Sequence, residues 1–377
     1  MKIEVKRNDL LRILEHVQSV VEKRNAIPIL SNVKITATSD GTLELEATDM
    51  DISISDSVKC TVLEAGNITL PAATFYEIVR KSPEKTAVLI DTTQQPSLGL
   101  ITIGTSEFNL PTLPAEEFPS FQVGKATNKF HIHSEILKNL LAKTRHAISN
   151  DETRYYLNGI YLHPATSDEG GQVLRAVSTD GHRLARAQTL LPEGCEAMAG
   201  VIIPKKAVGE IIKLLESYVG EVEVSLSDKK ISLKIGTTDF YSKLIDGKFP
   251  DYERVIPKNN DKYMEVSREN LLRSIDLVIS ISNDKTRAVK FNIEPSKLTV
   301  LATSEINGNS KGVQEMPVNY NSSEIITIDF NSRYVLDSLG AIDGDTVRVA
   351  LSSGAGAVIA QDANENNCIY ILMPMQV

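Results

Sequence analysis

The sequence is short of features that define several large classes of protein. Cysteine is rare, and Cys60, Cys195 and Cys368 lie far apart without a CxxC pair, which argues against a disulfide framework and a structural zinc site. Apolar residues never run for the roughly 18 positions that a membrane span requires, and the first residues contain no uninterrupted apolar core of the signal-peptide kind. We therefore expect a cytoplasmic protein with no metal and no cofactor.

Positive charge is also in deficit. The chain has 40 lysines and arginines against 49 acidic residues, a net charge of −9. A domain that grips nucleic acid tightly by neutralising phosphates is normally basic, so a tight reader of DNA sequence is not expected. The sum does not show whether the cations gather on one surface, and the pattern along the chain has to decide that.

What the sequence does contain is a threefold internal repeat. The stretch IEVKRNDLLRIL, from Ile3, returns as FHIHSEILKNLL from Phe130 and as MEVSRENLLRSI from Met264. The offset between the first and third copies is constant, since 266 − 5 and 271 − 10 both give 261. Each copy has the pattern of a strand, a polar cap and an amphipathic helix, and alternating strands close each unit.

The repeat predicts the domain organisation. At 377 residues the chain exceeds what one core usually organises, and each copy reads as a complete α+β domain. Polar stretches rich in Gly, Pro and Asn mark the linkers. We place the domains at residues 1–125, 126–257 and 258–377.

The predicted helices share a basic outer face. In the first helix Leu10, Ile13, Leu14 and Val17 form an apolar stripe, and Arg7 falls off it. The middle helix is expected to bury an apolar set that includes Ile136 and to leave its cations in water; these are Lys138, Lys143 and Arg145. Each face alone fits an ordinary solvated helix. Six helices with the same basic face favour loose, sequence-independent contact with a polyanion.

The nine residues STDGHRLAR, 178–186, suggest a different function. Asp180, His182 and Arg183 have the chemistry of an acid, a base and an anion clamp, so a hydrolase or transferase is one alternative. No nucleophile or metal cluster stands beside them in the sequence. A structural repeat protein that binds only other proteins is a further alternative.

The repeat and several motifs together resemble the bacterial DNA polymerase III beta subunits, the DNA sliding clamps, over the whole chain. The matching stretches are IPILSNV (27–33), RYYLNG (154–159), STDGHRLA (178–185), SKLIDGKFPDYERVIPKN (242–259) and the terminal MPMQV. The resemblance implies three domains of the DNA-clamp fold and a head-to-tail homodimer that forms a closed ring, with helices inside and antiparallel sheets outside. It also implies sequence-independent binding of double-stranded DNA.

The family also implies partners and the residues that bind them. The partners are the DNA polymerase III alpha subunit, an ATP-driven clamp loader, and other polymerases and repair proteins that bind through short peptide motifs. Apolar and methionine side chains suit such peptides. Similarity assigns the partner-peptide cleft to Thr179, Gly181, His182, Arg183, Leu184, Pro250, Arg254, Val255, Met373, Pro374 and Met375.

Two further sets of residues follow from the resemblance and from the basic helix faces. The expected DNA contacts are Arg24, Lys138, Tyr155, Tyr156 and Lys205. The expected dimer interface consists of Phe108 and Leu110 on one side and Ser280 and Ile281 on the other. The chain departs from the family pattern at Ala73 and Asp151, near expected DNA contacts, and at the terminal Gln376 and Val377, which bear on peptide preference.

Overall fold

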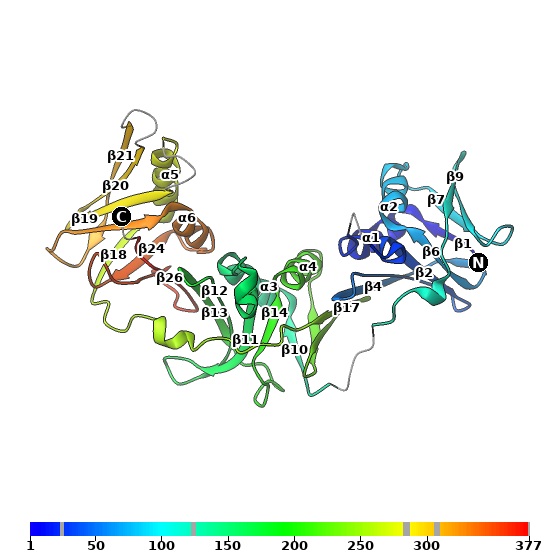
Figure 1. The fold of residues 1–377 in the computed structure, drawn as a ribbon, viewed down its shortest axis with the longest axis horizontal. Helices are drawn as coiled ribbons and strands as arrows, with labels where there is room; N and C mark the ends of the chain where they lie inside the picture. Colours follow the sequence, from blue (N-terminus) through cyan, green and yellow to red (C-terminus); the bar gives the residue numbers. More distant parts are fainter. Residues whose placement is uncertain (23–25, 122–125, 282–286, 305–309, 376–377) are drawn as a thin grey trace. The chain divides into compact units, whose positions relative to one another are not determined.

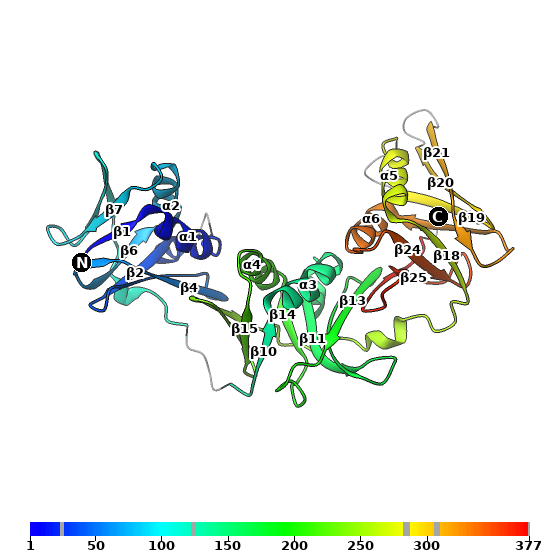
Figure 2. The same ribbon diagram turned by 180° about the vertical axis from the view of Figure 1, so that it is seen from behind.

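The computed structural model describes residues 1–22, 26–121, 126–281, 287–304 and 310–375. The chain forms two compact units. The first comprises Met1–Glu135, Glu193–Ala197 and Gly209–Leu244, and the second Ile136–Pro192, Met198–Val208 and Ile245–Val377. Each unit holds two antiparallel sheets with helices packed on them (Figures 1 and 2). Within the described ranges, no helix is long and apolar enough to cross a membrane.

The first unit contains a five-stranded and an eight-stranded sheet. The smaller has the order β5-β1-β7-β8-β9, with β1 at Lys2–Lys6, β5 at Thr61–Glu64, β7 at Ala87–Asp91, β8 at Leu98–Ile103 and β9 at Ser106–Pro111. The larger has the order β10-β15-β16-β17-β4-β3-β2-β6. Its strands are β2 (Asn32–Thr38), β3 (Thr42–Thr48), β4 (Ile52–Lys59), β6 (Gly66–Pro71), β10 (Asn128–His133), β15 (Glu221–Leu226), β16 (Lys230–Ile235) and β17 (Thr238–Lys243).

The second unit contains a nine-stranded and a four-stranded sheet. The larger has the order β14-β11-β12-β13-β26-β25-β24-β18-β22. Its strands are β11 (Gly159–Thr166), β12 (Gln172–Thr179), β13 (Arg183–Leu190), β14 (Val201–Pro204), β18 (Lys262–Ser267), β22 (Asn319–Tyr320), β24 (Thr346–Leu351), β25 (Val358–Asp362) and β26 (Cys368–Leu372). The smaller has the order β21-β20-β19-β23. Its strands are β19 (Ala288–Glu294), β20 (Lys297–Ser304), β21 (Ser310–Pro317) and β23 (Ile326–Asn331).

The helices come in three pairs, one pair for each copy of the repeat. The α-helices are α1 (Arg7–Gln18), α2 (Ala72–Lys81), α3 (Ser134–Thr144), α4 (Lys205–Glu216), α5 (Arg268–Ile279) and α6 (Ser332–Gly340). Short 3-10 helices are η1 (Pro28–Ser31), η2 (Ala115–Glu117), η3 (Arg145–Ala147), η4 (Glu152–Leu157) and η5 (Tyr252–Val255).

The same hydrogen bond recurs at the start of the first helix of each copy. The N–H of the first helical residue donates to the carbonyl oxygen of the residue just before a later strand of the same copy, which is β7, β15 or β24. The three bonds are Arg7 N to Thr86 O at 2.9 Å, Ser134 N to Gly220 O at 2.9 Å, and Arg268 N to Asp345 O at 2.8 Å. This agreement confirms the threefold α+β repeat that the sequence predicts.

Strand pairing joins each copy of the repeat to the one before it. The closing strand β17 of the second copy pairs with β4 of the first, and the closing strand β26 of the third pairs with β13 of the second. The closing strand of the first copy, β9, is an edge of its sheet, and β21, which corresponds to β4 and β13, is also an edge. Within the described residues, neither β9 nor β21 has a partner on its outer side.

Helix α1 shows why these segments fold as they do. Leu10, Ile13, Leu14 and Val17 are fully buried and pack on β3 and β4, and each contributes about 1.5–3 kcal/mol through burial. Arg7, expected on the polar side, is instead buried. Its guanidinium donates to the carbonyl oxygens of the last turn of α2, including Val79 O at 2.9 Å.

Helix α3 departs from the sequence expectation at two positions. Ile136, expected in the core, is 42% exposed. Lys143, expected in water, has a side chain that is only 19% exposed, and its ammonium pairs with Asp343 at 2.6 Å. Periodicity shows which face of a helix is apolar. It does not show which residues at the ends of that face are covered, because the elements that cover them lie far away in the sequence.

Candidate functional site

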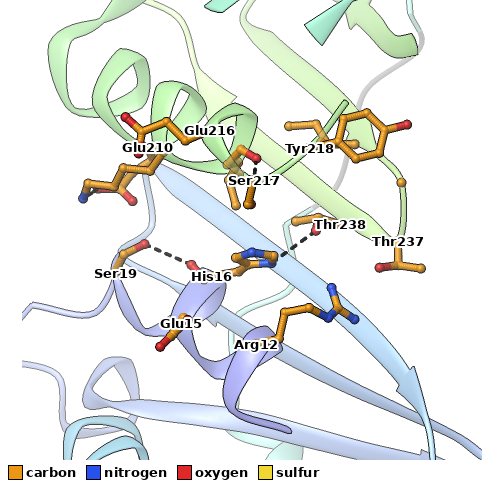
Figure 3. Close-up of a pocket in the computed structure, with 14 residues that line it drawn as sticks. Arg12, Glu15, His16, Ser19, Glu210, Glu216, Ser217, Tyr218, Thr237 and Thr238 are labelled. Carbon is orange, nitrogen blue, oxygen red and sulfur yellow. Dashed lines mark hydrogen bonds and ion pairs between the residues drawn. The ribbon is translucent and has the colours of Figure 1, made fainter. Parts of the chain in front are cut away.

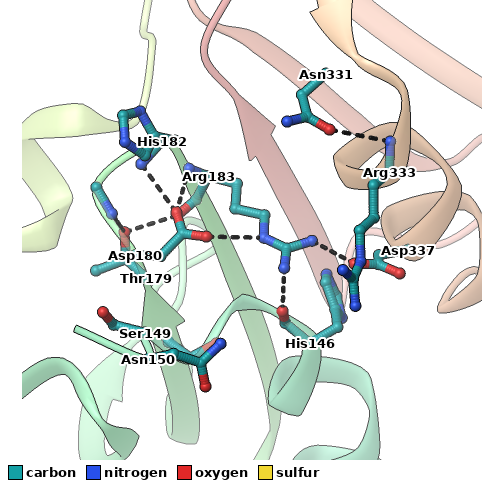
Figure 4. Close-up of polar contacts among 12 residues, drawn as sticks. His146, Ser149, Asn150, Thr179, Asp180, His182, Arg183, Asn331, Arg333 and Asp337 are labelled. Atoms are coloured by element: carbon teal, nitrogen blue, oxygen red, sulfur yellow. Dashed lines mark hydrogen bonds and ion pairs between the residues drawn. The ribbon is translucent and has the colours of Figure 1, made fainter. Parts of the chain in front are cut away.

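The loop between β12 and β13 is built by its own polar residues. Asp180 Oδ1 accepts hydrogen bonds from the backbone N–H groups of His182 and Arg183 at 2.9 and 3.0 Å. Thr179 Oγ1 donates to Arg183 O at 2.7 Å and accepts from Gly181 N at 3.1 Å. Gly181 has a φ of +90°, a conformation that side chains disfavour. The acid and the threonine of STDGHR therefore shape a tight turn (Figure 4).

Arg183 is committed to structural contacts. Its side chain is 9% exposed, and the guanidinium binds Asp180 at 3.1 Å, Asp337 at 2.6 Å and the carbonyl oxygen of His146. The guanidinium also lies over the Tyr334 ring, 4.3 Å from its centroid. Arg183 thus pins the loop to α6 and η3 (Figure 4).

An apolar cavity of about 260 Å³ opens beside this loop. Seven of the eleven residues expected in a peptide cleft line it: Thr179, Gly181, Arg183, Leu184, Pro250, Val255 and Met373. The strand β26 brings the carboxy-terminal residues here, since Ile371 is paired with Leu184 in register and Met373 N donates to His182 O at 3.0 Å. The volume is slightly below the usual range of small-molecule pockets, about 300–1,000 Å³.

Four expected cleft residues do not line the cavity. His182 is exposed beside Tyr334, with ring centroids 6.5 Å apart. Arg254 is 83% exposed and pairs with Asp251 at 2.7 Å. Met375 donates its N–H to Asp329 O at 2.8 Å, and Pro374 precedes it. Gln376 and Val377 lie outside the described residues.

The cavity also has walls that the sequence did not assign to it. These residues are Arg154, Tyr156, Leu157, Asp251, Tyr252 and Ile371. Three of them lie in the RYYLNG stretch, where the tyrosines were assigned to DNA instead. These three residues lie in η4, whose side chains point in more than one direction, and sequence alone does not show which of them face the cavity.

A second, polar cavity of about 510 Å³ lies next to the same loop. Its cations are Arg145, Arg154, Arg183, Lys205, Arg287 and Arg333, and its acids are Asp151, Asp180 and Asp337. The acids are already paired, Asp151 with Arg154 at 2.9 Å and the other two with Arg183. The wall of this cavity therefore carries a net positive charge, inside an acidic chain.

The expected DNA contacts are distributed around this region. Tyr155 is 54% exposed, and its ring meets Tyr156 edge-on at 5.8 Å. Lys205 is exposed at the start of α4 and donates to Asn150 Oδ1 at 2.5 Å. Lys138 is half-buried on α3. Arg24 lies outside the described residues.

The expected interface residues lie at edges of their own units. In the first unit Phe108 and Leu110 are on the edge strand β9, where Phe108 is half-buried and Leu110 is 8% exposed. In the second unit Ser280 and Ile281 follow α5, with Ser280 exposed. Ile281 lies near Gly312 of the edge strand β21.

Another cavity, of about 680 Å³, lies in the first unit between α1, α4 and the β16–β17 turn (Figure 3). Asp56, whose side chain is wholly buried behind it, accepts hydrogen bonds from His16 Nδ1 and Thr237 Oγ1, both at 2.7 Å. Burial alone would raise the pKa of Asp56, but the hydrogen bonds and the charge of Arg12 outweigh it and lower the pKa. This cluster joins β4 to the turn before β17, and no pattern in the sequence predicts it.

The three thiols and His146 are not poised for catalysis. Burial raises the pKa of all three thiols, to about 12 for Cys195, so none is a thiolate at neutral pH. Burial, helped by the charge of Arg183, lowers the pKa of His146 to about 4. In the part of the chain that the structure describes, no group of three or more His, Cys, Asp and Glu side chains could hold a metal ion.

Comparisons with known proteins agree with one another. The chain matches the family models of the DNA polymerase III beta subunit, with the N-terminal domain at residues 1–122, the central domain at 131–251 and the C-terminal domain at 253–376. It is 41% identical to the beta sliding clamp of Caulobacter vibrioides and 34% identical to that of Pseudomonas aeruginosa, over the full length of both chains. The crystal structure of the Bartonella birtlesii sliding clamp bound to griselimycin, 41% identical, superposes with a TM-score of 0.95 over all of both chains.

Proposed function

The chain belongs to the bacterial DNA polymerase III beta subunit family, and we propose that this DNA sliding clamp closes, as a head-to-tail homodimer, into a ring around double-stranded DNA. It is a non-catalytic processivity factor. No observation supports the hydrolase or transferase alternative, because Asp180 and Arg183 are taken up in the turn and its anchoring. A ring holds DNA by topology, so its direct contacts can be weak.

The pattern of strand edges carries the proposal. Twice within the chain, the closing strand of one copy pairs with the same strand position of the preceding copy, β17 with β4 and β26 with β13. The same rule applied to β9 requires a strand equivalent to β21. A second copy of the chain supplies it, and its own β9 receives β21 in return, so two identical seams close the assembly.

The seam residues of the sequence prediction fit this scheme. Phe108 and Leu110 lie on β9, and Ser280 and Ile281 follow α5 beside β21. We place the domain boundaries near residues 125 and 258, so that each ring has three domains from each chain. In the cell we place the protein in the cytoplasm, where replication takes place.

We assign DNA contact to the basic helix faces and to the polar cavity. Lys138, Tyr155, Tyr156 and Lys205 remain the proposed contacts, with Arg24. Lys and Arg neutralise phosphates irrespective of sequence, and exposed aromatic rings stack on unpaired bases. Asp151, which departs from the family pattern, is neutralised by Arg154, so its charge does not face the DNA alone.

The apolar cavity is the proposed seat of partner peptides. Its apolar walls and the exposed Met373 suit short linear segments of the DNA polymerase III alpha subunit, the clamp loader and other polymerases and repair proteins. The relative from Bartonella birtlesii was crystallised with griselimycin, and we propose that this chain binds the same compound.

Retention on DNA of defined topology tests the ring. The protein is loaded onto nicked circular DNA by the clamp loader, separated from free protein, and then exposed to a restriction enzyme that linearises the circle. We expect the protein to stay on the circle and to leave the linear product within minutes. Persistence on DNA with free ends would contradict the ring, and so would failure to remain on the circle.

A further inference from the structure

The wall of the apolar cavity formed by residues 249–255 has few attachments to the rest of its unit. Pro250, Tyr252 and Val255 face the cavity, and η5 spans only Tyr252–Val255. Among the described residues, none in 249–256 donates or accepts a backbone hydrogen bond with the neighbouring sheet. Side chains must therefore hold this wall in place.

Tyr252 makes the first attachment. Its side chain lies in the core, with the residue only 5% exposed, and it has both a face on the cavity and a hydroxyl directed at the sheet. The hydroxyl lies 3.0 Å from His163 Nε2 on β11 and 3.5 Å from an Arg175 nitrogen on β12. One side chain thus links the cavity surface with two strands behind it.

The bonding around His163 fixes the direction of this link. His163 Nδ1 lies 2.8 Å from the carbonyl oxygen of Pro164, and a carbonyl oxygen only accepts, so Nδ1 carries the hydrogen. Burial lowers the pKa of His163, which keeps the ring neutral near pH 7 and leaves Nε2 as an acceptor. The Tyr252 hydroxyl therefore donates to Nε2 and can accept from Arg175.

Arg175 makes the second attachment. Its side chain is 3% exposed and is held by Gln188 Oε1 at 2.9 Å and by the carbonyl oxygen of Thr166 at 3.0 Å. The remaining arm donates to Glu253 Oε1 at 2.6 Å. A buried guanidinium requires compensation by acceptors, so the pair with Glu253 ties η5 to the sheet.

Stacked rings support the same wall. The Tyr161 ring lies between His163 and Phe249, with centroid distances of 4.4 and 4.9 Å. The rings of Tyr161 and Phe249 are nearly parallel, at 8°. Phe249 meets Tyr252 edge-on at 6.5 Å. The polar links and the stack converge on Tyr252.

We propose that Arg175 and His163 are positioning residues which, through Glu253 and Tyr252, fix the cavity wall and thereby set how tightly the cavity holds a partner segment. Neither lines the cavity, and both act from its far side. The inference rests on the proposed role of the cavity as the partner-peptide cleft. It predicts that small polar changes behind the wall weaken partner binding, although no contact surface is altered.

The test measures binding of the DNA polymerase III alpha subunit from the same organism by biolayer interferometry. Tyr252→Phe keeps the ring in the wall and removes only the hydroxyl, and we expect the Kd to rise about 3- to 10-fold, as for loss of one or two buried hydrogen bonds. His163→Phe should have a similar effect. Both substitutions remove the hydrogen bond between Tyr252 and His163. The double variant should therefore bind the alpha subunit no more weakly than the single variant with the higher Kd, a result that independent structural defects would not give.

Control variants separate this role from general destabilisation. Tyr161→Phe removes a hydroxyl from the same stack without touching a bond to Tyr252 and should bind like the wild type. Arg175→Lys keeps the charge but not the fork that reaches Gln188, Thr166 and Glu253 together, and it should bind more weakly. The melting temperature of every variant is measured beside its Kd.

The outcomes are distinguishable from failure of the proposed function. If the wild type does not bind the alpha subunit, the cleft itself is wrong. If the wild type binds and Tyr252→Phe, His163→Phe and Arg175→Lys bind equally well, the positioning role is overturned. Additive losses in the double variant, in proportion to lowered melting temperature, would also overturn it.

Discussion

At the scale of single residues, the side chains that look catalytic in the sequence build the structure instead. Asp180 closes a turn with two backbone hydrogen bonds, and Arg183 joins that turn to Asp337 and Tyr334. Burial of ionisable side chains in a structural role places them in low-dielectric surroundings, which shifts their pKa values. The consequence for stability is clearest at His146, whose ring packs at a tilt against Tyr370, with ring centroids 5.5 Å apart.

His146 should make stability depend on pH below neutrality. Its pKa in the fold is about 4, below the roughly 6.5 of an unfolded chain, so unfolding takes up a proton between these values. Its stabilising contribution is complete above about pH 6.5 and is lost as pH falls toward 4, with about 2 kcal/mol gone by pH 5. Urea unfolding at pH 7.5 and pH 5, at fixed protein concentration, measures the loss.

His146→Phe isolates this effect. The ring makes no side-chain hydrogen bond within the described part of the chain, so phenylalanine can keep the ring contact with Tyr370 without leaving a polar group unpaired. The variant should lose less stability than the wild type between pH 7.5 and pH 5. His131→Gln, at an exposed position on β10, serves as the control. Equal losses for His146→Phe and the wild type would refute the assignment.

Residue roles were only partly predictable. The motif STDGHRLA and Met373 identified five of the thirteen residues that line the cavity, and Pro250 and Val255 raise this to seven, because those residues follow a recognisable family pattern. Arg175 lies in the strand QVLRAVST, where nothing distinguishes a buried, bonded arginine from an exposed one. Its partner Glu253 is 78 residues away, and such pairs follow from the tertiary fold alone.

At the scale of elements, an arginine at the start of the first helix caps the end of the second. Arg7 donates to the carbonyl oxygens of Val79 and Arg80 at the end of α2. The third copy differs, since Arg268 donates to Gly344 O at 3.0 Å, four residues beyond the end of α6, and so binds the following loop rather than the helix end. The last carbonyl oxygens of a helix lack partners within the helix, and a cation there also opposes the negative end of the dipole.

Removing this cap should destabilise the first copy. Arg7→Met keeps the apolar stem and loses both bonds, and we expect a loss of about 2 kcal/mol in the free energy of unfolding. Arg273→Met, which removes an exposed i, i+4 pair with Glu269 on α5, should cost about 0.5 kcal/mol or less. Chemical denaturation of both variants tests the difference, and equal losses would show that the cap contributes nothing specific.

The elements themselves were more predictable than their connections. Period-two and helical patterns, repeated three times, indicated the α+β copies correctly. The pairing of β17 with β4 and of β26 with β13 was not predictable, because alternation shows which face of a strand is buried but not which edge it pairs with. The burial of Arg7 was not predictable for the same reason. Its side chain was expected in solvent, because the sequence does not show that α2 lies beside it.

At the scale of the whole molecule, the seam decides whether the protein functions. An acidic chain of net charge −9 holds a polyanion poorly by attraction alone, so the proposed ring would hold DNA by its closure. The pairing seen twice within the chain leaves β9 and β21 without the corresponding partner among the described residues. The proposed ring would therefore be as stable as two copies of the interface between β9 and β21.

Phe108→Asp should open that interface. Phe108 is half-buried on the edge strand, where Leu110 is already packed in the core, so Phe108 is the apolar side chain available to a second chain, and a carboxylate there would have to be desolvated on pairing. Sedimentation velocity should show single chains in place of the two-chain species, and retention on nicked circles should be lost. Leu190→Asp, at an 81% exposed position on β13, should change neither. A Phe108→Asp protein that stays dimeric and remains on circular DNA would contradict a seam at β9 and would place it at another of the sheet edges.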